Sequence, residues 1–428
     1  MQLAKKIVRK IKSKVKSKIG RAREYKHKLI RAIKQKNYNV VSFRQWCEAK
    51  NLPITILETN KKVTIVPPII HAAEKIQPLP FQELQAALPD VYLATLKNVT
   101  VIEGSDIVIA DNATALYDEM AYDPEGKYEP RMNAAQIIEK RYVNPVRVDL
   151  VCKKNARRSI AKYAIHFCKD YSPNYFHWLI EALPRMSIIE KFPELDAVPL
   201  LIDDNLQPQQ MELLHLINNK KRELIKLKQN EAYVIENLFY PSGLSHMHNN
   251  YYYPVSYNKD LVTSPDAIDY LRKKLIPPDQ EVISNRNIYI SRKNLGHSKR
   301  LINDEEISIY LAGKGFEIIY PEKMTIAEQI KVFSEANVII GASGSAFANL
   351  VFAPKNCRVF VLSANNKQVN LNLFAMIAHS LQMECTYVLG HDESANSCTQ
   401  THNDFRVDIE IIESILNHSR SDLSVHPV

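Results

Sequence analysis

The chain has 428 residues, of which 46% are hydrophobic and 24% are charged, and its formal net charge is +9. This composition is typical of a folded globular protein that is long enough for two domains, and it excludes a largely disordered chain. No run of 18 apolar residues occurs, so we expect no membrane-spanning helix.

The positive charge is concentrated at the N-terminus. Residues 1–36 contain 15 Lys and Arg but a single acid, Glu24, so the rest of the chain is slightly acidic. One helical stripe of this segment carries the apolar residues Leu3, Ile7, Val8, Ile11, Val15 and Ile19. We therefore predict a basic amphipathic arm that binds an anionic membrane surface, the alternatives being a partner-docking helix or a plain tail. Aromatic residues are scarce there, so nucleic acid is not an expected partner.

The cysteines indicate the cellular compartment. The six cysteines are scattered, without a CxxC pair or a zinc-ligand spacing, and the basic start is not followed by an apolar signal region. We expect reduced thiols and a cytoplasmic protein that is peripheral on the inner face of the plasma membrane.

Residues 37–260 are expected to form an N-terminal, acceptor-side domain. Its first part, up to about residue 160, shows short β-like runs that we interpret as a β-rich lead-in packed onto this domain. Strands and helices then follow in turn, with predicted strands at 161–167, 198–202, 223–228, 232–235 and 238–240, and predicted helices at 175–192 and 208–217.

Residues 261–428 alternate plainly between helices and strands, which predicts a parallel sheet. Strands are expected at 287–291, 316–320, 338–340, 358–362 and 384–389, and helices at 266–275, 303–313, 325–336, 346–352, 368–382 and 407–417. Asn303 with Glu306 and Thr325 with Glu328 have the spacing of capping boxes. Ligands bind beyond the carboxyl ends of such strands, so Ser291, Pro321, Gly341 and Ser363 are expected to face one crevice.

The stretch 341–345 (GASGS) joins a strand to a short helix through small residues. Such a turn lets a ligand approach the backbone and aims free N–H groups at an anion such as a diphosphate. Gly341, Ser343, Gly344 and Ser345 are therefore candidate donor-binding residues. The alternative is a tight turn whose small residues only permit close packing.

A basic cluster follows the strand at 287–291. Arg292, Lys293, Lys299 and Arg300 provide the donors that suit a diphosphate, the alternative being a solvated loop. Glu322 follows the next strand and is a candidate acceptor for ribose hydroxyls, or else a solvated acid.

His177 and Glu181 lie four residues apart on a predicted helix. A carboxylate that orients an imidazole makes a general base, whereas a buried pair that satisfies itself is the structural alternative.

Three motifs carry a family resemblance: NYFHWLIEALPR (174–185), YISRK (289–293) with Arg300, and GASGSAFANLVFAP (341–354). In order and spacing they resemble glycosyltransferase family 61 over roughly residues 90–390. The resemblance implies a GT-B-like α/β fold of two Rossmann-like domains, inversion at the sugar carbon, a nucleotide-sugar donor and no required metal or cofactor. Asn349, in the third motif, joins the donor-binding candidates. Many family members have a His where this chain has Ser343, so backbone donors must contribute more here.

The sequence thus predicts an inverting glycosyltransferase that extends a capsular or lipopolysaccharide glycan. The expected acceptor is a glycan or lipid-linked glycan. Two alternatives stay open: a nucleotide-sugar epimerase or hydrolase, and a non-catalytic scaffold of polysaccharide assembly. A homo-oligomer is also left open.

Overall fold

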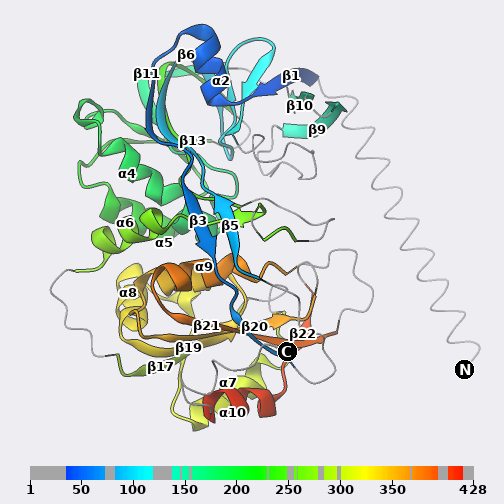
Figure 1. Ribbon diagram of the computed structural model, residues 1–428. Helices are drawn as coiled ribbons and strands as arrows, with labels where there is room; N and C mark the ends of the chain where they lie inside the picture. Colours follow the sequence, from blue (N-terminus) through cyan, green and yellow to red (C-terminus); the bar gives the residue numbers. More distant parts are fainter. Residues whose placement is uncertain are drawn as a thin grey trace, which may run out of the picture.

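The computed structural model describes residues 35–72, 82–118, 137–144, 147–153, 157–228, 231–247, 255–257, 259–277, 284–295, 300–366, 369–393 and 403–417. The predicted arm at residues 1–36 falls almost entirely outside these ranges, as does Lys299. The described chain is an α/β protein, as its alternating pattern predicted, and its two large sheets lie one above the other (Figure 1). We call the upper sheet with its helices the N-terminal half and the lower sheet with its helices the C-terminal half.

The sheet of the N-terminal half has a parallel part and an extension that is antiparallel except where β1 pairs with β8. The parallel strands, in spatial order, are β13 (Leu224–Leu227), β12 (Leu200–Asp203), β11 (Arg157–His166) and β14 (Ala232–Pro241). The extension continues through β6 (Val91–Ile102), β7 (Val108–Ile109), β8 (Thr114–Leu116), β1 (Gln35–Val41), β10 (Arg147–Lys153) and β9 (Ile137–Asn144), and β2 (Ile54–Glu58) also pairs with β6. The two short runs predicted at 232–240 are therefore one strand, β14, which pairs with β6 along most of its length.

The helices of this half lie beside the parallel strands. They are α3 (Tyr175–His177), α4 (Met186–Ile189), α5 (Pro208–Ile217) and α6 (Pro265–Leu275), while α2 (Phe43–Lys50) covers the extension (Figure 1). Helices α5 and α6 both begin with proline, whose fixed φ suits the first helical position and whose missing N–H has no intrahelical partner there.

The C-terminal half contains the parallel sheet that its alternation predicted. The spatial order is β18 (Glu317–Ile319), β17 (Arg286–Ile290), β19 (Ala336–Ala342), β20 (Arg358–Ala364) and β21 (Glu384–Asp392). Beyond β21 lie an antiparallel strand, β22 (Phe405–Arg406), and a parallel strand, β4 (Ile69–Ala72). Because β4 comes from the lead-in that we expected to pack on the N-terminal half, the chain crosses to the second sheet and back before residue 90.

Helices cover both faces of this second sheet (Figure 1). α7 (Asp304–Gly313) and α10 (Ile409–Asn417) pack on the lower face, and α8 (Ile326–Ser334), α9 (Asn372–Ser380) and the 3-10 helix η7 (Ser345–Phe352) pack on the upper face. The Thr325 cap of α8 is confirmed, with reciprocal bonds to Glu328. The capping box predicted at Asn303 is wrong, since its side chain bonds the backbone of Val407 instead.

The two halves share one continuous hydrophobic core. It runs from Trp178 and Leu179 in the N-terminal half to Phe347 and Phe374 on the upper face of the second sheet. The antiparallel pair of β3 (Lys62–Ile65) and β5 (Leu84–Ala87), between which the chain passes through β4, lies across the junction and packs on α9. The paired strands β15 (His246–Met247) and β16 (Leu261–Val262) join this packing. In the described part of the chain, no helix combines the length and the hydropathy needed to cross a bilayer.

Candidate active site

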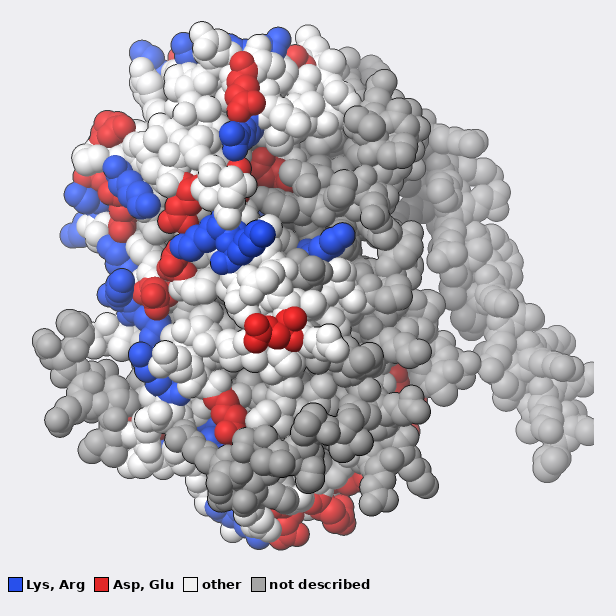
Figure 2. Space-filling view, in the orientation of Figure 1, with Lys and Arg blue, Asp and Glu red and all other residues white. Residues whose placement is uncertain are grey.

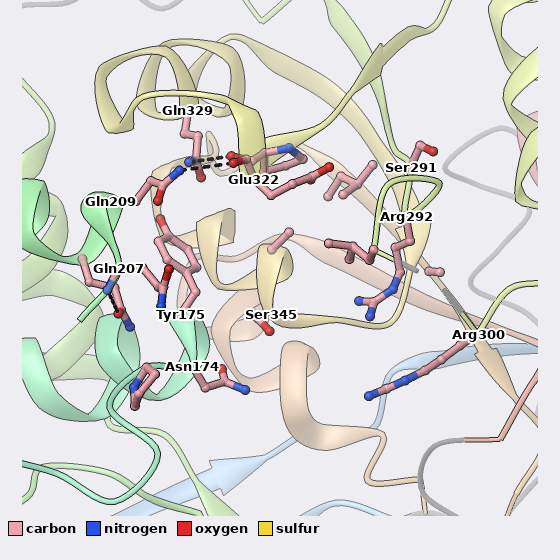
Figure 3. Close-up of a pocket in the computed structure, with 17 residues that line it drawn as sticks. Asn174, Tyr175, Gln207, Gln209, Ser291, Arg292, Arg300, Glu322, Gln329 and Ser345 are labelled. Carbon is pink, nitrogen blue, oxygen red and sulfur yellow. Dashed lines mark hydrogen bonds between the residues drawn. The ribbon is translucent and has the colours of Figure 1, made fainter. Parts of the chain in front are cut away.

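A cavity of about 460 Å³ lies between the two halves. The C-terminal half contributes residues at or just after the ends of β17, β18 and β19, and the N-terminal half contributes the start of α3 and the loop into α5 (Figure 3). The carboxyl ends of parallel strands thus open onto one space, as predicted for Ser291 and Pro321. Ser363 does not line the cavity, because it is still inside strand β20.

Arg292 directly follows β17 and its guanidinium points into the cavity (Figure 3). Burial and the positive charge of neighbouring Arg300 lower the pKa of Arg292 from 12.5 to about 10, because both disfavour the charged form. Arg292 therefore remains a cation at neutral pH. An anion bound beside it would offset both unfavourable effects.

Asp304, the first residue of α7, fixes the backbone that carries Arg292. Its fully buried carboxylate accepts hydrogen bonds from the hydroxyls of Tyr289 (2.8 Å) and Ser291 (2.7 Å) and from the N–H of Arg292 (3.3 Å). A carboxylate with three donors is well satisfied in a buried position. The end of β17 is therefore held rigidly where it enters the cavity.

Arg300 also lines the cavity and lies near Arg292 in Figure 3. Its φ is 58°, in the left-handed region that a residue with a side chain rarely adopts. This conformation costs about 1–2 kcal/mol, so the surrounding structure must impose it. Such a backbone distortion is often found where a side chain has to be aimed at a ligand.

The turn after β19 differs from the anion cradle that the sequence predicted. Gly341 lies within β19 and pairs with β17 and β20, and the N–H of Ser343 donates to Leu362 O at 2.8 Å. The first helical hydrogen bond of η7 runs from Phe347 N–H to Gly344 O. The N–H groups of Ser345 and Ala346, the first two residues of the helix, come before this bond and have no acceptor within the helix. Both of these residues line the cavity, and their N–H groups are the backbone donors that an anion could reach.

The two glycines of this turn serve packing. A Cβ at Gly341 would lie 2.8 Å from Ile290 Cβ, so this glycine permits the close approach of β17. A Cβ at Gly344 would lie 1.7 Å from Arg292 Nη1, and Arg292 Nη1 donates weakly to Ser343 O at 3.4 Å. Gly344 thus leaves room for the guanidinium of Arg292, and Ser343 contributes its carbonyl oxygen.

Two further candidates from the sequence have different positions. Glu322, in the 3-10 helix η6 (Pro321–Lys323) after β18, lines the cavity (Figure 3). Lys293 does not line it; its side chain is half exposed and forms an ion pair with Glu305 at 2.7 Å. The structure therefore brings Arg292, Arg300 and Glu322 together and leaves Lys293 at the surface.

Asn349 is fully buried beneath the cavity and links its two walls. Its Oδ1 accepts from the hydroxyl of Tyr175 at 2.6 Å, and its Nδ2 donates to Gln329 Oε1 at 2.7 Å. Gln329 in turn donates to Pro321 O at 3.0 Å. Asn349 thus positions Tyr175 and Gln329, both of which line the cavity, rather than lining it itself.

The N-terminal half supplies carboxamides that the sequence analysis missed. Asn174, Gln207 and Gln209 line the cavity opposite the arginines (Figure 3). Asn174 Oδ1 caps α3 through Phe176 N–H, and Gln209 Nε2 donates to the carbonyls of Glu322 and Met324 across the junction. All three carboxamides come after the carboxyl ends of β11 and β12. The expectation that ligands bind beyond such strand ends, which we applied only to the C-terminal half, would have identified them.

His177 and Glu181 are both buried and are hydrogen-bonded through His177 Nδ1 and Glu181 Oε2. Their helix is irregular: α3 passes into a π-helical segment, η2 (Trp178–Ala182), and then a 3-10 turn around Pro184. Pro184 has no N–H, which breaks the regular bonding pattern, and π segments are frequent at functional sites. The structure brings this pair together close to Tyr175, but neither residue lines the cavity.

Arg185, at the end of the same segment, has a structural role. It is 1% exposed and donates hydrogen bonds to the carbonyls of His166, Cys168 and Pro241, at the ends of β11 and β14. Its guanidinium thus connects the segment that contains His177 to the carboxyl ends of two inner strands of the sheet. Among the described residues, no group of three His, Cys, Asp or Glu side chains is arranged to hold a metal ion.

Comparison with known proteins gives the family of this site. Residues 175–360 match the model of glycosyltransferase family 61, and this region contains Tyr175, His177, Arg292, Arg300 and the turn before η7. No curated protein matches the chain significantly. Residues 175–360 thus match a glycosyltransferase 61 domain, and this match supports a glycosyltransferase activity.

Proposed function

We propose that the protein is an inverting glycosyltransferase that moves a sugar from a nucleotide-sugar donor to a hydroxyl group of a growing glycan. One observation carries this proposal: two neighbouring arginines and the first amides of η7 converge on one wall of the cavity between the halves. The leaving group of such a donor is a nucleoside diphosphate, whose charge these donors would stabilise as it departs.

The opposite wall suits the neutral part of the donor. Its carboxamides, Asn174, Gln207 and Gln209, offer both donors and acceptors to sugar hydroxyls. Glu322 lies beside the arginines and would accept from the ribose hydroxyls. Asn349 would act from below by holding Tyr175 in place.

The pair His177 and Glu181 would supply the proton chemistry. Glu181 binds Nδ1 of His177, which orients the ring so that Nε2 accepts the proton of the acceptor hydroxyl. The acceptor oxygen then bonds to the anomeric carbon while the bond to the diphosphate oxygen breaks. A single displacement of this kind inverts the anomeric configuration.

The arrangement of the halves supports a GT-B-like layout. In such a fold two Rossmann-like domains face each other across the donor site, and here two parallel sheets direct their strand ends at one cavity. The C-terminal half would hold the nucleotide sugar, and the N-terminal half would present the acceptor.

We also propose an acceptor and a cellular location for the enzyme. A capsular or lipopolysaccharide glycan at the inner face of the plasma membrane fits the basic segment 1–36 and the family resemblance. On the face shown in Figure 2, basic and acidic side chains of the described residues are interspersed over α4, α5 and α6. The N-terminal segment, with its excess of Lys and Arg, would supply the attraction to an anionic surface.

A donor screen tests the proposal. Thermal unfolding is measured with a panel of nucleoside diphosphates and nucleotide sugars, and the best donor is then incubated with and without an acceptor glycan for mass spectrometry. We expect one nucleotide class to raise the melting temperature and an acceptor to gain one sugar with inverted configuration. Equal release of free sugar with and without acceptor would instead indicate a hydrolase, and no binding of any nucleotide would refute the donor site.

A further inference from the structure

The C-terminal segment around β22 packs against the segment that contains Arg300. Phe405 N–H donates to Arg300 O at 2.9 Å, and Ile302 N–H donates to Phe405 O at 2.9 Å. Leu301 and Phe405 form a parallel bridge, and both are buried. The backbone from Arg300 to Ile302 is therefore held on β22 as one strand is held on another.

Asn303 adds a second attachment, because its side chain binds Val407, two residues after Phe405. Its Nδ2 donates to Val407 O at 2.8 Å, and its Oδ1 accepts from Val407 N–H at 3.3 Å. Asn303 is 6% exposed and Val407 is fully buried. A buried carboxamide that matches both polar groups of one residue fixes the two segments in a single register.

Gly390 allows the C-terminal segment to lie this close. A Cβ at this position of β21 would lie 2.1 Å from Arg406 O and 2.8 Å from Val407 Cγ2. Any side chain there would push β22 away from the sheet. Strand β21 therefore contacts β22, and β22 in turn contacts the segment that contains Arg300.

These contacts bear on the left-handed conformation of Arg300. A residue with a side chain keeps a φ of 58° only when its surroundings impose it, and the direction of the side chain follows from the backbone. Phe405 bonds the backbone of Arg300 directly, and Val407 holds the side chain of Asn303, three residues further along the same segment. Phe405 and Val407 lie outside residues 175–360, the region that matches the family model.

We propose that Phe405 and Val407 position Arg300, so that its guanidinium meets the diphosphate of the donor. This inference rests on the proposed function, because it takes the cavity to be the donor site. Asn303, Phe405 and Val407 are positioning residues: they do not line the cavity, and they act through Arg300.

A double-mutant cycle tests the proposal. The affinities of the full chain for UDP and GDP are measured by calorimetry for wild type, Asn303→Ala, Arg300→Ala and the double variant, using the nucleotide that binds wild type more tightly. We expect Asn303→Ala to weaken binding about tenfold, comparable to weakening one charge-assisted hydrogen bond. In the Arg300→Ala background the same change should have less than about a twofold effect, because the guanidinium it positions is gone.

Arg406→Ala is the matched control. It lies on the same strand, but its ion pair with Glu306 is exposed, so affinity should stay within about twofold of wild type. If Asn303→Ala does not fold, Asn303→Asp, which keeps the acceptor for Val407 N–H, replaces it in the cycle. If Asn303→Ala lowers nucleotide affinity equally with Arg300 and with Arg300→Ala, the role of Asn303 is merely structural. That result would overturn this inference but not the proposed donor site. Failure of wild type to bind either nucleotide would overturn the donor site, and the inference with it.

Discussion

Tyr175 in the N-terminal half donates a hydrogen bond of 2.6 Å to Asn349 Oδ1 in the C-terminal half. The chain of bonds continues from Asn349 to Gln329 and from Gln329 to Pro321 O. Tyr175, Gln329 and Pro321 all line the cavity, so this chain connects its opposite walls. The separation of the walls is therefore set by buried hydrogen bonds as well as by the shared apolar core.

Tyr175→Phe should destabilise the protein by about 1–3 kcal/mol, because it leaves the buried Oδ1 of Asn349 without its donor. Urea unfolding measures this change. Tyr163→Phe is the control, since Tyr163 is 47% exposed on β11 and should change stability by less than about 0.5 kcal/mol. Equal stabilities of the two variants would show that the hydrogen bond does not link the halves.

Arg292→Ala should weaken nucleoside diphosphate binding about tenfold to a hundredfold, the usual effect of losing a charge-assisted hydrogen bond. Lys293→Ala is the natural comparison, because the adjacent lysine lies outside the cavity and pairs with Glu305. Its affinity should remain close to that of wild type. Calorimetry with the best nucleotide checks both, and a similar loss in the two variants would indicate only a diffuse attraction by the loop.

Gly344→Ala should lower nucleotide affinity without changing the charge of the site. The new Cβ would occupy the place of Arg292 Nη1, so the guanidinium must move. Gly313→Ala has no neighbour within 4 Å and lies at the end of α7, so it should stabilise the protein by up to about 1 kcal/mol and leave binding unchanged. Unchanged affinity in Gly344→Ala would mean that the position of Arg292 is unimportant.

His177→Ala should lower turnover by about 10²–10⁴-fold while nucleotide binding survives, because only the proton transfer is lost. Glu181→Gln should have a smaller effect, since the amide still contacts the ring but no longer stabilises its charged form. Product formation under saturating donor, together with calorimetry, separates the two effects. Turnover near that of wild type in His177→Ala would remove this residue from the mechanism and make Glu181 or the buried carboxylate of Asp170 the next candidate.

Deletion of residues 1–36 should abolish binding to vesicles that contain anionic lipid, because most of the excess positive charge lies there. Sedimentation with anionic and with neutral vesicles measures this for the full and the shortened chain. The full chain should leave the vesicles as salt is raised. Equal sedimentation of both chains would exclude the arm as the membrane contact.

The elements that depend on local pattern were predictable from the sequence. The predicted helix at 208–217 has these bounds in the structure, and the buried apolar runs of β19 and β20 identified the parallel sheet. Contacts between distant residues were not predictable. Asn303 has the spacing of a helix cap, yet its side chain binds Val407, which is 104 residues away.

Within the site, the sequence identified the region better than the individual residues. Arg292 and Lys293 are adjacent and equally basic, but the chain turns directly after Arg292, where Leu295 N–H donates to Arg292 O at 3.0 Å, and only Arg292 lines the cavity. Gly341 resembled a glycine that admits a ligand, whereas it admits the neighbouring strand. Both differences depend on three-dimensional packing, which a linear motif does not encode.

The crossing of β4 into the second sheet has a consequence for engineering this enzyme. Exchanging the donor-binding half with that of a relative at a single junction near residue 280 would pair β21 of the relative with Ile69–Ala72 of this chain. A chimera that takes its whole second sheet from one parent must transfer this four-residue strand together with the C-terminal half. Recombination between relatives therefore requires at least three junctions: one on each side of β4 and one between the two halves.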